Sequence, residues 1–172
     1  MAVNDLCSVS GILKLLQSVL IFITLLVHRH GDNGYYLFFA TTGLKLGNKD
    51  PNIDYENLGN STLVSFMIIN LVLILGYVLD GPEAIHASLL EPVWNLLGAC
   101  MFVASGAVTI ITWQNEKMVD TSAGMTETEF YRNVTAALAM AGLCITVGAL
   151  YLVDFIFGWV TRSRETDEYK NP

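Results

Sequence analysis

Four long apolar stretches constrain this chain more than any other feature of its sequence. They cover about residues 8–27, 62–79, 92–113 and 134–160. Each is close to the roughly 20 residues that a helix needs to cross a bilayer. Because lipid offers the backbone no hydrogen-bonding partners, such stretches cross the membrane as helices. The sequence therefore predicts an all-α fold, in which residues 1–172 form a single membrane domain built as a bundle of four transmembrane helices.

The composition agrees with a membrane protein and excludes several classes of function. Charged residues make up only 15% of the chain, whereas soluble domains average about 25%. The net charge of −7 leaves no basic patch for phosphates, so nucleic acid is excluded as a partner. The cysteines and histidines show no spacing typical of a metal site, and no phosphate-binding loop is present. We therefore expect no catalytic residue, metal or cofactor, and a protein that is not an enzyme.

The number of spans fixes the relative placement of the polar segments. With four spans, both termini share one side, and the connections 28–61 and 114–133 share the other. Two N-glycosylation sequons, at Asn60 and Asn133, lie in these connections and favour an extracellular position for them. The Lys and Arg residues slightly favour the reverse, since five lie in the connections and three in the tail 161–172. We predict cytoplasmic termini, with Cys7 as a candidate for acylation.

Two charged residues lie inside the predicted spans. Lys14 and Asp154 each sit about six residues from the same side of the membrane, or about 9 Å deep at a rise of 1.5 Å per residue. An unpaired charge at mid-bilayer costs about 2.5–3.5 kcal/mol or more. We therefore predict a structural ion pair that fixes the first helix against the fourth. Two alternatives stay open: Lys14 extends to the headgroups, or Asp154 carries protons or ions in a small channel or transporter subunit.

Small and amide side chains predict where the helices pack. Close approach of backbones drives helix association in lipid, and amides add hydrogen bonds across the interface. The fourth span carries small residues at spacings of four, three and four, which indicate either the core of the bundle or a face for a homo-oligomer. The predicted packing residues are Asn70, Gly98, Ala137, Ala141, Cys144 and Gly148.

The connection 28–61 is the predicted contact surface. Its stretch 34–48 is rich in aromatic and glycine residues, which favour short strands and tight turns. We predict a short β-hairpin there that pairs with another molecule, although residues 35–40 could instead lie in the membrane interface. The residues proposed for contact are Arg29, Gly31, Asp32, Gly34, Tyr35 and Tyr36.

Three stretches carry a resemblance to a known family. The first is R-x-G-D-x-G, at residues 29–34. The second is N-x-x-G-x-x-M, at residues 95–101, and the third is G-A-L-Y-L-V-D, at residues 148–154. With Lys14 in the first span, these stretches make the chain similar to the snakeskin-like proteins, the arthropod tetraspans of septate junctions that include the pasiflora type.

The resemblance implies a location and a role. The expected protein is a multi-pass component of the plasma membrane at lateral cell–cell junctions of an epithelium, with cytoplasmic termini. It would assemble with other septate-junction membrane proteins and contribute to the paracellular barrier. A vesicle-sorting tetraspan without a junction function remains an alternative. The connection 28–61 is longer and more aromatic here than expected for snakeskin itself, and the tail differs as well.

Overall fold

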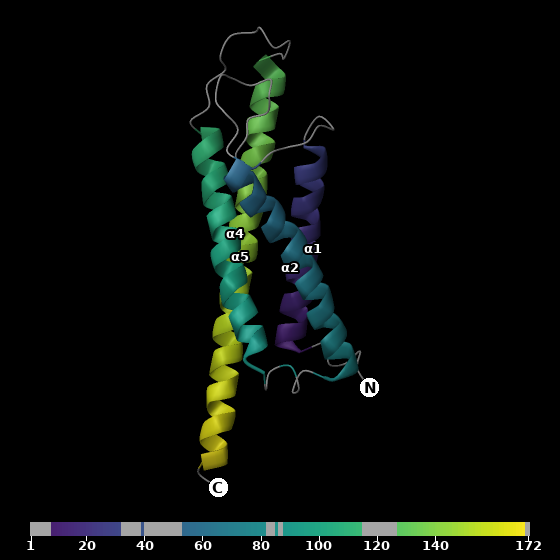
Figure 1. Ribbon diagram of the computed structural model, residues 1–172, viewed down its shortest axis with the longest axis vertical. Coiled ribbons are helices and arrows are strands. Elements are labelled where there is room, and N and C mark those ends of the chain that lie inside the picture. The colour runs from purple at the N-terminus through teal and green to yellow at the C-terminus, as the bar shows by residue number, and fades with distance from the viewer. Residues whose placement is uncertain are drawn as a thin grey trace.

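The computed structural model describes residues 8–31, 39, 53–81, 85, 88–114 and 127–170. They form the helices α1 (Val9–His30), α2 (Ile53–Leu79), α4 (Leu90–Gln114) and α5 (Glu127–Lys170), shown in Figure 1. The predicted all-α fold is therefore confirmed, and none of these residues lies in a strand. The predicted β-hairpin falls on residues outside this part of the chain, apart from Phe39, and has no support.

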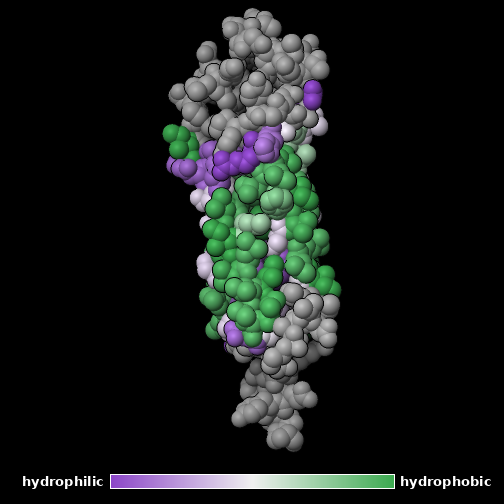
Figure 2. Space-filling view, turned by 90° about the vertical axis from the view of Figure 1, so that its right-hand side faces the viewer, coloured by the Kyte–Doolittle hydropathy of each residue, from purple (hydrophilic) through white to green (hydrophobic). Residues whose placement is uncertain are grey.

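All four helices contain a segment that is long and apolar enough to cross a membrane; in α5 this segment is Val134–Ser163. Large apolar side chains point away from the bundle along each helix, among them Ile12, Leu71, Val93 and Val153. On the face seen in Figure 2, hydrophobic side chains form a band across the middle of the molecule. Lipid accommodates such a surface at no cost, whereas in water a patch of this size would be an aggregation site.

Local residues define where the helices begin and end. Ser8 caps the start of α1, where its hydroxyl accepts a hydrogen bond from the amide of Gly11 at 3.1 Å. Gly31 ends α1 with φ 55°, and Gly81 follows α2 with φ 84°. These positive φ values disfavour any residue with a Cβ, so glycine is required at both positions. In α4, Pro92 lies in the first turn, which needs no amide donor from it.

Two helices extend beyond the apolar stretches of the sequence into residues that were predicted as connections or tail. Helix α2 begins at Ile53, within the stretch 28–61 that was predicted as a connection. Helix α5 includes residues 127–133 and most of the predicted tail 161–172. Hydropathy marks only the part of a helix that lies in lipid. The polar turn that starts α2 is favoured instead by Asp54 and Glu56, whose charges interact well with a helix N-terminus.

The helices form a ring in which neighbours are α1 and α2, α2 and α4, α4 and α5, and α5 and α1. The closest packing joins α4 to α5, which lie side by side in Figure 1. Aromatic rings fill the space between three of the helices. Phe102 of α4 stacks on Tyr151 of α5 with centroids 5.6 Å apart, and Phe66 of α2 meets Tyr151 edge-on at 5.4 Å.

Candidate functional site

A buried polar network lies inside the apolar bundle. Its residues come from the part of the bundle toward the end where α1 begins and α5 ends, which is the lower end in Figure 1. Every helix of the ring contributes two side chains to it, and none of them is more than 3% exposed. We call it the Lys14 network. It consists of Lys14 and Gln17 from α1, Asn70 and Tyr77 from α2, Glu91 and Asn95 from α4, and Tyr151 and Asp154 from α5.

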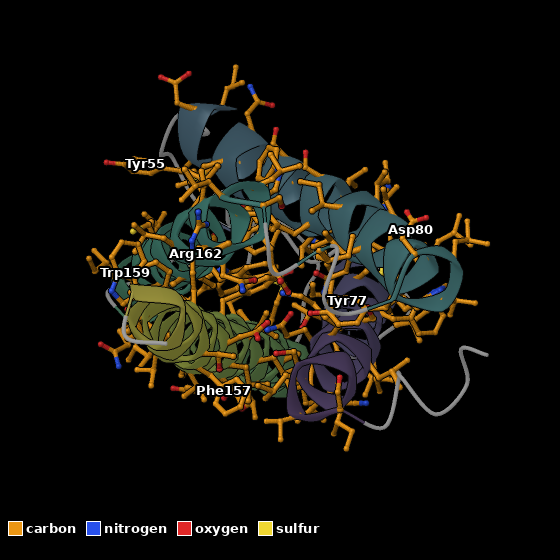
Figure 3. All side chains as sticks on the ribbon, turned by 90° about the horizontal axis from the view of Figure 1, so that it is seen from below. Tyr55, Tyr77, Asp80, Phe157, Trp159 and Arg162 are labelled. Atoms are coloured by element: carbon orange, nitrogen blue, oxygen red, sulfur yellow. The ribbon has the colours of Figure 1, made fainter. Side chains whose placement is uncertain are left out.

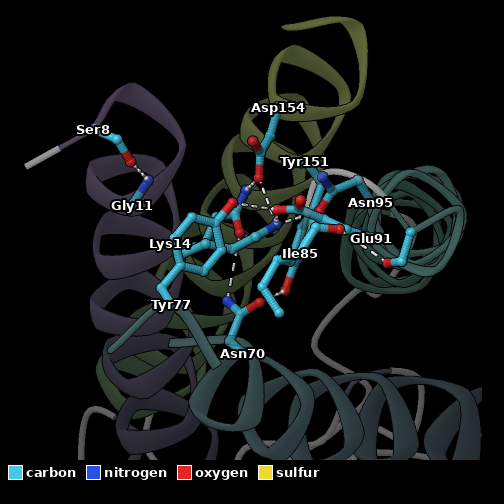
Figure 4. Close-up of polar contacts among 12 residues, drawn as sticks. Ser8, Gly11, Lys14, Asn70, Tyr77, Ile85, Glu91, Asn95, Tyr151 and Asp154 are labelled. Carbon is cyan, nitrogen blue, oxygen red and sulfur yellow. Dashed lines mark hydrogen bonds and ion pairs between the residues drawn. The ribbon is translucent and has the colours of Figure 1, made fainter. Parts of the chain in front are cut away.

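Lys14 is the centre of this network. Its Nζ lies 2.5 Å from Oδ2 of Asp154 and donates a hydrogen bond to Oδ1 of Asn95, also at 2.5 Å. Oε1 of Glu91 lies 3.5 Å from the same nitrogen, which also lies over the ring of Tyr151, 5.7 Å from the ring centroid. The ammonium group thus points into the bundle and joins α1 to α4 and α5, as Figure 4 shows.

Amide and hydroxyl groups extend the network to α2. Gln17 Nε2 donates to Oδ2 of Asp154 at 3.3 Å, and its Oε1 accepts from Asn70 Nδ2 at 3.5 Å. The hydroxyl of Tyr151 donates to Oδ1 of Asn70 at 2.8 Å. On the other side, the hydroxyl of Tyr77 donates to Oε1 of Glu91 at 2.8 Å. Each buried polar group named here therefore has a partner, as buried polar groups need.

Tyr77 marks how the network is enclosed. Seen from the end with the termini, its side chain lies among the helices, whereas Phe157 and Trp159 point outward (Figure 3). The exposures agree, since Tyr77 is fully buried and both other side chains are exposed. A charged cluster closed off in this way is stable only in one arrangement of the helices, because separating any pair leaves a charge or a polar group unpartnered in a low-dielectric core.

The geometry of the network suits a structural lock better than chemistry on a substrate. Its ammonium and its carboxylates contact one another and are screened from solvent. Among the residues of the described ranges, no group of three His, Cys, Asp or Glu side chains could hold a metal ion. The cluster links side chains from all four helices, an arrangement that in other proteins fixes the register between helices.

Part of this network was predicted from the sequence. Lys14, Asp154 and Asn70 were among the predicted residues, and the structure brings all three into one cluster. Glu91 and Tyr77 were not predicted as members. Glu91 and Asn95 are four residues apart, so both lie on one face of α4, and this spacing was the available signal. Tyr77 carries no such signal in the sequence.

The predicted small-residue face is covered within the chain itself. Ala137, Ala141, Cys144 and Gly148 are all buried. A Cβ at Gly148 would lie 2.8 Å from Cγ2 of Val103 and 3.2 Å from the carbonyl oxygen of Ala99, both on α4. On α4, Gly98 lies against Tyr151 and Phe66 in the same way. These residues therefore allow the close approach of α4 and α5, which is the core-packing alternative of the sequence analysis.

A second polar cluster lies at the opposite end of the bundle. We call it the Phe39 clasp, and it consists of His28, Phe39, Glu56, Gly59 and Asn60. The amide nitrogen of Asn60 donates to the backbone oxygen and to Oε1 of Glu56, both at 3.1 Å, while its Oδ1 accepts from Nε2 of His28 at 2.8 Å. Asn60, which was predicted as a glycosylation candidate, lies inside α2, and both its side-chain nitrogen and its side-chain oxygen form hydrogen bonds.

The other residues predicted at this end are placed only in part. Arg29 is exposed in the last turn of α1, and Gly31 forms its C-terminal cap. The predicted contact residues Asp32, Gly34, Tyr35 and Tyr36 lie outside the described residues. The second glycosylation candidate, Asn133, belongs to helix α5.

Comparisons with known proteins agree on one family. The chain is 30% identical to Protein snakeskin of Bombyx mori over 144 residues, which cover 83% of this chain and 86% of that protein. It is 24% identical to Protein snakeskin of Drosophila melanogaster over 157 residues, which cover 91% and 92% of the two chains. No family model and no solved structure matches it.

Two of the three stretches that carried the resemblance, together with Lys14, contribute to the buried part of the bundle. Lys14, Asn95, Tyr151 and Asp154 all belong to the Lys14 network, and Gly98 and Gly148 lie where α4 meets α5. The resemblance therefore rests in part on residues that contact one another between the helices. On this architecture and on the matches over most of its length, the chain belongs to the snakeskin family.

Proposed function

We propose that this protein is a structural membrane component of septate cell–cell junctions, where it helps to build the paracellular barrier of an epithelium. Membership of the snakeskin family is the observation that carries this proposal. The protein acts by packing and by complex assembly with other septate-junction membrane proteins. No residue has a catalytic role in it.

The Lys14 network supports a scaffolding mechanism. A junction component has to present the same surface in every copy, and a bundle locked by buried charges has one arrangement of its helices. The proposed contacts lie on the lipid-facing helix surfaces and on the connection between α1 and α2. Transmembrane helices associate through close packing and interhelical hydrogen bonds, so partners with small residues on their own helices fit the first of these surfaces.

The location of the protein tests the proposed function. A copy tagged at its own gene is expected along lateral cell–cell contacts, together with septate-junction markers. Loss of the protein is expected to let a fluorescent tracer pass between the cells, and the unaltered tagged copy should restore the barrier. A tagged protein found away from these contacts, with the tracer barrier intact after its loss, would sink the proposal.

The orientation of the chain gives a separate prediction. We propose cytoplasmic termini, which place the connection between α1 and α2 outside the cell. An epitope at either terminus should then bind antibody only after the cells are permeabilised, whereas an epitope inserted in the segment 40–52 should bind antibody on intact cells. The reverse labelling pattern would show that the termini are outside the cell and that the Phe39 clasp lies on the cytoplasmic side.

A channel or transporter subunit is the weaker alternative. An ion-carrying carboxylate normally faces a water-filled cavity, but Asp154 is buried and contacts Lys14 and Gln17. Proteoliposomes that contain the purified protein are expected to show no proton or cation current above that of empty vesicles. A current that disappears in the Asp154→Asn variant would favour the alternative.

A further inference from the structure

Phe39 lies between α1 and α2 in the chain and contacts both helices. Its side chain is 1% exposed, and its ring lies 4.9 Å from the ring of His28 in the last turns of α1. Its backbone amide donates a hydrogen bond to Oε2 of Glu56 in α2 at 2.8 Å. Both the side chain and the main chain of this residue are thus attached to the bundle.

Gly59 provides the space that the ring of Phe39 occupies. A Cβ at residue 59 would overlap the ring of Phe39, because the three atoms nearest to it are carbon atoms of that ring. No turn or positive φ explains the glycine, since residue 59 lies inside α2, where glycine costs roughly 1 kcal/mol relative to alanine in general helix scales. Its absent side chain is therefore explained by the close approach of Phe39.

The hydrogen bonds around the ring link the two helices to each other. Glu56 accepts from Phe39 through Oε2 and from Asn60 through Oε1, and Asn60 accepts from His28 of α1. The charged oxygens of Glu56 make these bonds stronger than bonds between neutral groups. The clasp therefore joins α1, α2 and one point of the connection in a single bonded unit.

We propose that the Phe39 clasp positions the segment that connects α1 and α2 for contact with partner proteins. It divides the connection into the segments 32–38 and 40–52, and each of them begins and ends at a point fixed to the bundle. Fixing the ends of a loop in advance lowers the entropic cost of ordering it on a partner. Phe39 and Gly59 are positioning residues in this scheme, which rests on the proposed function for the identity of the partners.

Amide hydrogen exchange of the whole protein in lipid nanodiscs tests the clasp directly. The amide of residue 39 is expected to be protected, and the Phe39→Ala and Gly59→Ala variants should each speed its exchange by about tenfold or more, since the bonded amide is then released from a closed local unit. Because Gly59→Ala acts through the ring, it should add nothing in the Phe39→Ala background. Gly142→Ala, at a lipid-facing glycine with no neighbour in reach, is the matched control.

Exchange results decide whether the clasp exists. Fast exchange at residue 39 in the unaltered protein would overturn the proposal, as would additive effects of the two substitutions. Exchange in the core of α4 and α5 should stay unchanged in the single variants. If this core also loosened, the clasp would be a general stabilising contact and the proposal would fail.

Recovery of junction proteins tests the positioning role. When the protein is purified from detergent extracts of the epithelium, septate-junction membrane proteins should no longer be recovered with the Phe39→Ala or the Gly59→Ala variant. They should be recovered again with the Phe39→Leu variant. The double substitution Tyr35→Ala with Tyr36→Ala should cause the same loss without speeding exchange at residue 39. Normal co-purification by a variant with an open clasp would overturn the positioning role.

The proposed function can fail independently of the clasp. If the unaltered protein recovers no junction proteins and lies away from cell contacts, the proposed function fails. The exchange measurements still decide on the clasp in that case, because they need no partner.

Discussion

Replacing Lys14 by Met is expected to lower the free energy of unfolding by about 3–5 kcal/mol, the range for removing one partner of a buried ion pair. The cause is the carboxylate of Asp154, which then lies in the bundle core without the ammonium that contacts it at 2.5 Å. Asn95 loses a hydrogen bond at the same time. Thermal unfolding of the purified protein in detergent measures the loss, and the fraction that reaches the cell surface reports its effect in cells.

The matched control for Lys14→Met is Asp80→Asn. Asp80 is charged and lies at the end of α2, but it is exposed. Surface substitutions of this kind usually change stability by no more than about 0.5 kcal/mol. A melting temperature that falls equally in both variants would contradict the assignment of Lys14 to a buried ion pair.

The double variant Lys14→Met with Asp154→Asn separates pairing from burial. If the two side chains form a pair, the double variant loses less stability than the sum of the single losses. Exchanging the two charges should restore stability only in part, because a carboxylate at position 14 would lie near Glu91, which is now 3.5 Å from the Lys14 nitrogen. Strictly additive losses would contradict the ion pair.

Replacing Gly148 by Leu should prevent α4 and α5 from packing, with a loss of stability of about 3 kcal/mol or more, at the upper end for overpacked cores. Even the first carbon of the new side chain would lie 2.8 Å from Val103 and 3.2 Å from the backbone of Ala99. The side chain of Val103 can move, but the helix backbone cannot. We expect a poorly folded protein that is retained inside the cell, measured by its thermal unfolding and by its surface fraction.

Gly142 provides the control for this substitution. It lies on the same helix as Gly148, and nothing lies within 4 Å of the Cβ it would have. Gly142→Leu should therefore be neutral or slightly stabilising, because leucine favours a helix over glycine by roughly 0.5–1 kcal/mol. If Gly142→Leu impaired the protein as much as Gly148→Leu, the lipid-facing side of α5 would itself be a contact surface.

The candidate site was predictable only where chain topology constrains it. Lys14 and Asp154 were expected at one depth, because an even number of spans brings both termini to the same side. Their contact with Asn95, Glu91 and Tyr77 depends on how each helix is rotated about its axis. Rotation is hard to derive here, because apolar residues surround most of each span and the sequence shows no strong polar face.

The clasp shows a second limit of sequence reasoning. The aromatic stretch 34–48 predicted a hairpin or a membrane-interface segment, and neither predicts that Phe39 fits against Gly59. The contact depends on two residues that are 20 positions apart: Gly59, which lies inside a helix, and Phe39, whose ring occupies the space that a side chain at residue 59 would need. Residues 53–61 were also assigned to the connection, so the helix that carries Gly59 was not expected there.

The sequence by itself determined that the described part of the chain contains four helices long and apolar enough to cross a membrane, because the bilayer sets the length of an apolar stretch and demands that its backbone be helical. It also determined that two opposite charges lie at a common depth. Only the tertiary structure decided that these charges share a network with side chains from all four helices, that the small residues of α5 are covered by α4, and that Phe39 is fixed to the bundle. The physical reason is that lipid exerts no preference between the faces of an apolar helix, so close packing and hydrogen bonds between helices choose the faces that meet.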